Sequence, residues 1–211
     1  ARVRIAIGDL AAAGECLETV SDNVRRGDDW VIYGNRYSVL TRADLLLQQG
    51  ALSEALATVD TALMLAEQAD DDILRTTALL TKSEVLTRLG RHADTNVALQ
   101  TASARLAQQP PLLLAHYERA TGCALAAEGQ TDAARSHMAR AVRIYDGIHH
   151  APGTVDAASA WRRSTGREDL ETFCSQSLTS ARTPAEVIHD VAALMLDRKS
   201  TRLNSSHITI S

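Results

Sequence analysis

Histidine and aspartate clusters are the side-chain groups of this chain whose types and spacing could bind a metal ion. His149 and His150 are adjacent, but no matched set of further ligands accompanies them, so we expect no metal site there. Three acids, Asp70, Asp71 and Asp72, follow one another, yet no glycine-centred loop with a closing glutamate follows at calcium-loop spacing. We therefore interpret the acidic run as the start of a helix, where aspartate favours the N-cap position.

Motifs that carry known catalytic chemistry do not occur in the sequence. The patterns GxSxG, HExxH, GxGxxG and GxxxxGK[ST] are all missing. The three cysteines, Cys16, Cys123 and Cys174, are far apart and odd in number, which is typical of reduced thiols and fits a cytoplasmic protein. The sequence predicts a protein that is not an enzyme and holds no cofactor; an enzyme with a mechanism outside these motifs is left open.

Composition and charge narrow the function further. Apolar residues make up 45% of the 211 residues and aromatic residues only 3%, and alanine and leucine supply most of the apolar part, which favours packed helices. The net charge of −4 gives no basic footprint for nucleic acid. No apolar run approaches the roughly 18–20 residues that span a membrane. Because the first residue is Ala1 and not Met, we expect the chain to begin within a longer protein.

Residues 197–211 differ in kind from the rest of the chain. They read DRKSTRLNSSHITIS, with no alanine and with four serines. This string resembles the translation of a common sequencing adapter, residue for residue. We therefore expect it to be an artefactual tail, exclude it from the argument about the fold, and expect the natural protein to continue past Leu196.

Four glycines recur at a period of about forty residues: Gly8, Gly50, Gly90 and Gly129, with spacings of 42, 40 and 39. After each glycine, apolar or small residues stand at offsets of 5, 9 and 12, which lie on one face of a helix. These positions are Ala13, Leu17 and Val20; Ala55, Val59 and Ala62; Thr95, Leu99 and Ala102; and Ala134, Met138 and Ala141. The pattern predicts that each glycine ends one helix in a left-handed conformation and that a packed helix follows.

A second series of helices is predicted from start signals between these blocks. The signals are Asp28-Asp29, Asp70-Asp71-Asp72, Pro110-Pro111 and Pro152-Gly153-Thr154. The helices that they open are expected over Trp30–Gln49, Ile73–Leu89, Leu112–Glu128 and Val155–Ser164. The fold class is then all-α, built from antiparallel helix pairs that repeat as an α-solenoid with about 40 residues per repeat. An ordinary four-helix bundle is the alternative.

The recurring signature Gly-x4-Ala-x3-apolar-x2-Ala is closest in Gly50–Ala62 and Gly129–Ala141 and resembles the second half of a tetratricopeptide repeat. Gly122 and Leu125 also stand where that family has a glycine and a large residue. The chain departs from the family in its longer period and in Thr95, which replaces the key alanine. Longer repeats of this kind are typical of the TPR-like regions of large bacterial signalling and transcription regulators, and the resemblance covers about residues 5–150.

The resemblance implies a domain organisation. Residues 1–166 are expected to form the helical repeats, and residues 167–196 to form capping helices or the start of a following domain. In that second part, Glu168–Ala181 is predicted to be a helix, and Thr183 with Glu186 forms a capping box that opens another. Residues 197–211 are the tail described above.

The resemblance also implies a function: a protein–protein interaction scaffold, or a sensory segment of a larger cytoplasmic bacterial regulator, that binds a protein segment or its own output domain. The partner is expected in a groove lined by the first helix of each pair, and basic or neutral segments would suit its acids better than acidic ones. The corresponding residues are Tyr37, Leu40, Asp44, Gln48, Thr77, Leu80, Glu84, Arg88, His116 and Arg119, with Cys123 beside them. The alternative is a small-molecule sensor with a ligand inside the superhelix, near Tyr33, Tyr37 or Tyr117.

Overall fold

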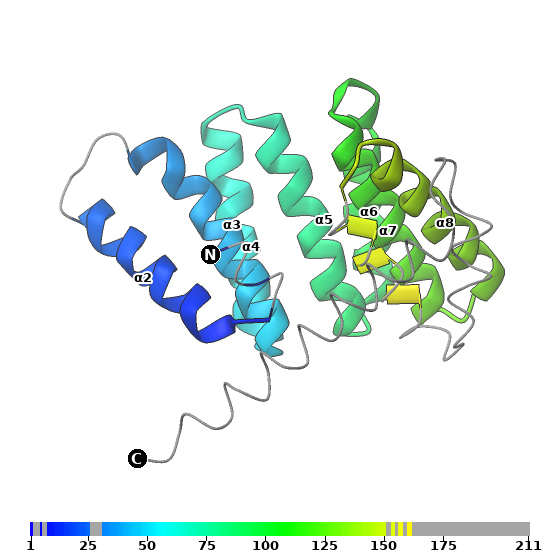
Figure 1. The fold of residues 1–211 in the computed structure, drawn as a ribbon, viewed down its shortest axis with the longest axis horizontal. Helices are drawn as coiled ribbons and strands as arrows, with labels where there is room; N and C mark the ends of the chain where they lie inside the picture. The colour runs from blue at the N-terminus through cyan, green and yellow to red at the C-terminus, as the bar shows by residue number, and fades with distance from the viewer. Residues whose placement is uncertain are drawn as a thin grey trace, which may run out of the picture. The chain divides into compact units, whose positions relative to one another are not determined.

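The chain is helical wherever a computed structural model describes regular secondary structure in it. The structure describes residues 8–25 and 31–150, together with residues 1, 5, 153, 154, 156, 157, 160 and 161. The bounds of the helices are α2 Leu10–Arg25, α3 Val31–Gln49, α4 Leu52–Gln68, α5 Asp72–Arg88, α6 His92–Ser103, α7 Pro111–Ala127 and α8 Thr131–Gly147, with a 3₁₀ turn η1 at Leu106–Gln108. Short turns join α3 to α4, α4 to α5, α5 to α6 and α7 to α8 (Figure 1).

The predicted turn glycines adopt the backbone conformation that the sequence pattern requires. Gly8, Gly50, Gly90 and Gly129 all have positive φ, between 71° and 82°. The residues that follow the last three, Ala51, Arg91 and Gln130, have nearly identical dihedrals, with φ between −78° and −88° and ψ between 63° and 65°. The same turn geometry therefore joins α3 to α4, α5 to α6 and α7 to α8.

Each of these three helix ends is closed by the same pair of backbone hydrogen bonds. At the end of α7, the N–H of Gly129 bonds to the carbonyl of Ala126, and the N–H of Gln130 reaches back to Leu125. The ends of α3 and α5 repeat this pattern at Gly50 and Gly90. The bonds satisfy carbonyls that a helix end otherwise leaves unpaired, and the left-handed residue they need is glycine because glycine has no Cβ.

The start signals act as predicted at two helices. The Asp71 carboxylate accepts the backbone N–H of Leu74 at 2.9 Å and so caps α5. Pro110 stands at the N-cap of α7, and Pro111 occupies its first turn. The observed α3, α5 and α7 begin and end within about one residue of the predicted ranges. Asp28-Asp29 and Pro152 lie outside the described residues, as do the helices predicted over Glu168–Ala181 and after Thr183.

The described helices fall into two compact units, within Ala1–Val85 and within Leu86–Leu194, and the dividing point lies inside α5. In the first unit, α3 packs against both α2 and α4. Its core consists of small and medium side chains that are completely buried: Leu40, Ala43, Val59, Ala62, Ala66, Leu74 and Ala78. A second cluster joins Leu47, Ala55 and Val85, so α3, α4 and α5 share one interior.

The second unit is centred on the pair of α7 and α8. Because only a short turn joins them and they pack along their length, the two helices are antiparallel. They approach closely at Gly122, where an added Cβ would lie 3.2 Å from the backbone oxygen of Ala134 and 2.9 Å from Cγ of Met138. Glycine at this position permits the approach.

The predicted buried faces are confirmed with one difference. Eleven of the twelve residues at offsets 5, 9 and 12 are buried, and Val20 is half-buried. Thr95, which replaces an alanine, is fully buried, and its hydroxyl donates to the carbonyl of Arg91 at 3.0 Å. Buried Ser83 likewise donates to the carbonyl of Leu80. Both hydroxyls are satisfied within their own helix, which explains why these polar residues are tolerated in the interior.

Candidate functional site

The predicted groove residues of the first unit lie on neighbouring helices. Two contacts bring α3 and α5 together: the Tyr37 hydroxyl donates to the Asp71 carboxylate at 3.1 Å, and the Thr81 hydroxyl donates to Asp44 at 3.2 Å. Tyr37 and Gln48 are exposed, and Asp44 is half-buried. On α5, Thr77 and Glu84 are both half-buried. These five side chains therefore reach the surface from two adjacent helices.

Two of the predicted groove residues belong to the core instead. Leu40 is completely buried and packs with Val59 and Ala62 of α4, and Leu80 is only 3% exposed. The prediction that they line a binding surface is wrong. The sequence register places Leu40 on the same side of α3 as Tyr37 and Asp44, and Leu80 on the same side of α5 as Thr77 and Glu84. Packing against other helices buries the apolar residue at the edge of each side.

The remaining predicted groove residues belong to the second unit. Arg88 is exposed, and His116 and Arg119 are half-buried on α7. His116 faces α8, where its Nδ1 lies 3.0 Å from the hydroxyl of Tyr145. Tyr145 is completely buried, and its ring also stacks on His150 with 5.5 Å between ring centroids. His116 thus serves at least in part to hold α7 against α8. Cys123 is half-buried on the same helix.

The two side-chain groups that suggested metal binding have structural partners. Asp71 caps α5, and Asp70 has a positive φ of 49° at the end of α4. His149 ends α8 in the same conformation, with a φ of 54°, while Nδ1 of His150 accepts the backbone N–H of Gly153 at 3.0 Å. Across the part of the chain that the structure describes, no three His, Cys, Asp or Glu side chains gather as a metal site would require.

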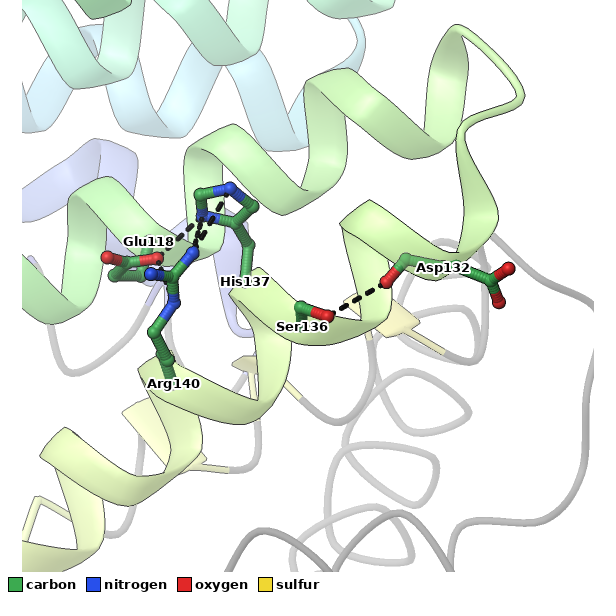
Figure 2. Close-up of polar contacts among 5 residues, drawn as sticks. All are labelled: Glu118, Asp132, Ser136, His137 and Arg140. Atoms are coloured by element: carbon green, nitrogen blue, oxygen red, sulfur yellow. Dashed lines mark hydrogen bonds and ion pairs between the residues drawn. The ribbon is translucent and has the colours of Figure 1, made fainter.

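A polar cluster that the sequence did not single out lies between α7 and α8. Its centre is the Glu118 carboxylate, whose side chain is only 11% exposed. Nδ1 of His137 lies 2.6 Å from Oε2 of Glu118, and Nε of Arg140 lies 3.2 Å from the same oxygen. Figure 2 shows both side chains of α8 converging on this carboxylate of α7. A nearly buried acid is thereby paired with two nitrogen donors, as burial of a carboxylate requires.

The geometry of the cluster fixes the roles of its nitrogen atoms. A carboxylate only accepts hydrogen bonds, so Nδ1 of His137 is the donor to Glu118. Nη2 of Arg140 lies 3.1 Å from Nδ1 and 3.2 Å from Nε2 of the same ring. Arg140 therefore contacts both other members of the cluster, His137 through Nη2 and Glu118 through Nε.

This cluster can hold the guanidinium of Arg140 in a fixed position at the protein surface. Glu118 is nearly buried, His137 is 23% exposed at its side chain, and Arg140 is 46% exposed. The planar guanidinium of arginine presents five N–H donors, and the contacts through Nε and Nη2 do not use all of them. One sequence signal could have indicated the cluster: Glu118 and Arg140 stand at equal distances on either side of Gly129, as facing residues of an antiparallel pair do.

A scan against protein-family models and a search of curated proteins both found no match to this chain. None of the helices in the described residues is both long and apolar enough to cross a membrane.

Proposed function

We propose that this chain is a helical-repeat scaffold that binds a protein segment on the surface formed by α3 and α5. The support for repeats is the recurrent turn: three helix pairs are joined through a glycine of positive φ and a following residue of nearly constant dihedrals. Such pairs bury their apolar faces against their neighbours, as in α-solenoids, and extended binding surfaces result from that stacking.

The observation that carries the binding proposal is the contact of α3 with α5. The Tyr37–Asp71 and Thr81–Asp44 hydrogen bonds align two helices that are not consecutive in the chain. Tyr37 and Gln48 are exposed and Asp44 and Glu84 half-buried, so the surface mixes an aromatic ring, an amide and acids. A surface of this kind suits a neutral or basic protein segment, whose amides and cations can pair with the acids.

A selection of peptides from a random library on the full chain tests this proposal. Peptides that bind the chain are expected to be neutral or basic. Their affinity is expected to fall at least about fivefold in Gln48→Ala and in Glu84→Gln, since truncating a contributing interface residue costs about 1 kcal/mol or more. Glu67→Gln is the matched control because Glu67 is exposed on α4 and carries the same charge change.

The proposal fails if no selected peptide loses affinity in the α3 and α5 variants. It also fails if Glu67→Gln weakens binding as much as Glu84→Gln does, because the effect would then be one of net charge. Circular dichroism of each variant establishes that the helices are intact.

A further inference from the structure

The outer face of α8 carries positive charge in a protein whose net charge is negative. Residues 133–145 of this helix contain three arginines and one histidine but no acid. Asp132, in the first turn, is exposed, while Asp146 at the far end is 5% exposed. The three arginines and the histidine therefore stand between the two acids of α8, Asp132 near its start and the buried Asp146 near its end.

The three arginines have different surroundings. Arg135 lies over the ring of Trp161, with its guanidinium carbon 6.0 Å from the ring centroid. Arg140 pairs with Glu118, and its Nη2 lies 3.1 Å from Nδ1 of His137. Arg143 is exposed, and no ion-pair partner for it is found among the residues that the structure describes. Because Arg140 and Arg143 are three residues apart, they lie on the same side of α8.

The neighbouring surface adds an apolar contact. Leu114 is 38% exposed on α7, one helical turn before Glu118 and on the same side of that helix. On α8, Ser136 is exposed one turn before Arg140, and its hydroxyl donates to the carbonyl of Asp132 (Figure 2). The site thus has two guanidinium groups on α8 and an exposed leucine on the Glu118 side of α7, and this chemistry suits a segment that carries carboxylates and an apolar side chain.

We propose that Arg140 and Arg143, with Arg140 positioned by the Glu118 carboxylate, recognise the carboxylate side chains of an acidic protein segment. Guanidinium and carboxylate groups match in planar geometry and can form two parallel hydrogen bonds. An arginine that is already held in place loses less side-chain entropy when it binds than a mobile one does. This inference shares with the proposed function only the expectation that the partner is a protein segment. It concerns a different surface, which involves neither α3 nor α5.

Fluorescence anisotropy with labelled peptides tests the site on the full chain. The probe is a capped peptide of several glutamates with one leucine, and its matched control replaces every glutamate by glutamine. At low ionic strength the glutamate peptide is expected to bind and the glutamine peptide not to bind. Arg140→Gln and Arg143→Gln are each expected to weaken binding by about fivefold, the upper range for an exposed ion pair.

Two further variants separate recognition from bulk charge. Arg91→Gln makes the same charge change at an exposed arginine of the same unit, paired with Asp94, and is expected to leave the affinity unchanged. Glu118→Met keeps a side chain of similar length but removes the acceptor that holds Arg140, while making the protein more positive. If the net charge of the protein determines the affinity, this variant binds the acidic peptide more tightly. If the position of the Arg140 guanidinium determines it, the variant binds the peptide more weakly. If Glu118→Met does not fold, Glu118→Gln is used in its place.

Three results would overturn the inference: equal loss of affinity in Arg91→Gln and Arg143→Gln, tighter binding after Glu118→Met, or a single-stranded RNA that binds these arginines more tightly than the glutamate peptide. Failure of the α3 and α5 variants to affect selected peptides, with the α8 results intact, would instead remove the proposed function and leave this site standing.

Discussion

A Cβ atom on Gly122 would lie 2.9 Å from Cγ of Met138, closer than real Cβ contacts come. The two residues mark a close approach of α7 and α8. Their relationship predicts that Gly122→Val destabilises the protein by about 1–3 kcal/mol, because the larger side chain must displace the buried methionine. Urea unfolding measures the change.

The control for this prediction is Gly147→Val. Gly147 is the last residue of α8, and a Cβ added there meets nothing within 4 Å. Overpacking is therefore specific to Gly122, and equal destabilisation by both variants would contradict the close approach of the two helices.

The turn glycine Gly90 tests the role of backbone conformation alone. A Cβ added there meets no atom within 4 Å, but the φ of 71° is one that other residues rarely adopt. Gly90→Ala is expected to lower the free energy of unfolding by about 1 kcal/mol, the cost of a left-handed conformation for a residue with a Cβ. A thermal melt with no loss of stability would exclude this account of the turn.

His149 gives the opposite test at the end of α8. It is exposed and has a φ of 54°, so it occupies a glycine position without being glycine. His149→Gly is expected to raise the free energy of unfolding by about 1 kcal/mol because it relieves the same conformational cost. If chemical denaturation shows a decrease instead, the imidazole makes a stabilising contact that outweighs the backbone effect.

Ala55 tests the buried face of α4. It is completely buried beside Leu47 and Val85. Ala55→Arg is expected to cost more than about 3 kcal/mol, since it overpacks the interior and buries a charge without a partner. Ala57→Arg is the matched control on the exposed side of the same helix and is expected to change stability little. Similar melting temperatures for the two variants would contradict the alignment of the repeats.

Asp71 links the start of α5 to α3. Its carboxylate accepts the N–H of Leu74 and the hydroxyl of Tyr37. Asp71→Ala is expected to cost about 1 kcal/mol through the lost cap. Tyr37→Phe is expected to destabilise the wild type but to have little further effect in the Asp71→Ala background. A double-mutant cycle measures this coupling, and additive effects would show that the two residues act independently.

The helices and their turns could be predicted from the sequence because their causes are local. A left-handed residue after a helix requires glycine, and Gly50, Gly90 and Gly129 indicate those turns directly. The offsets of 5, 9 and 12 after each glycine follow from 3.6 residues per turn, and eleven of those twelve side chains are buried. Asp71 and Pro111 similarly marked two helix starts through their own chemistry.

The candidate site depended on tertiary structure. Periodicity within one helix assigned Leu40 and Leu80 to a surface, but packing against other helices buried them, since burial depends on everything that surrounds a helix. The same limit applies to Glu118, His137 and Arg140. In the sequence they are one acid on α7 and two nitrogen-bearing side chains on α8, and only the antiparallel packing of the two helices brings these groups within hydrogen-bonding distance of one another.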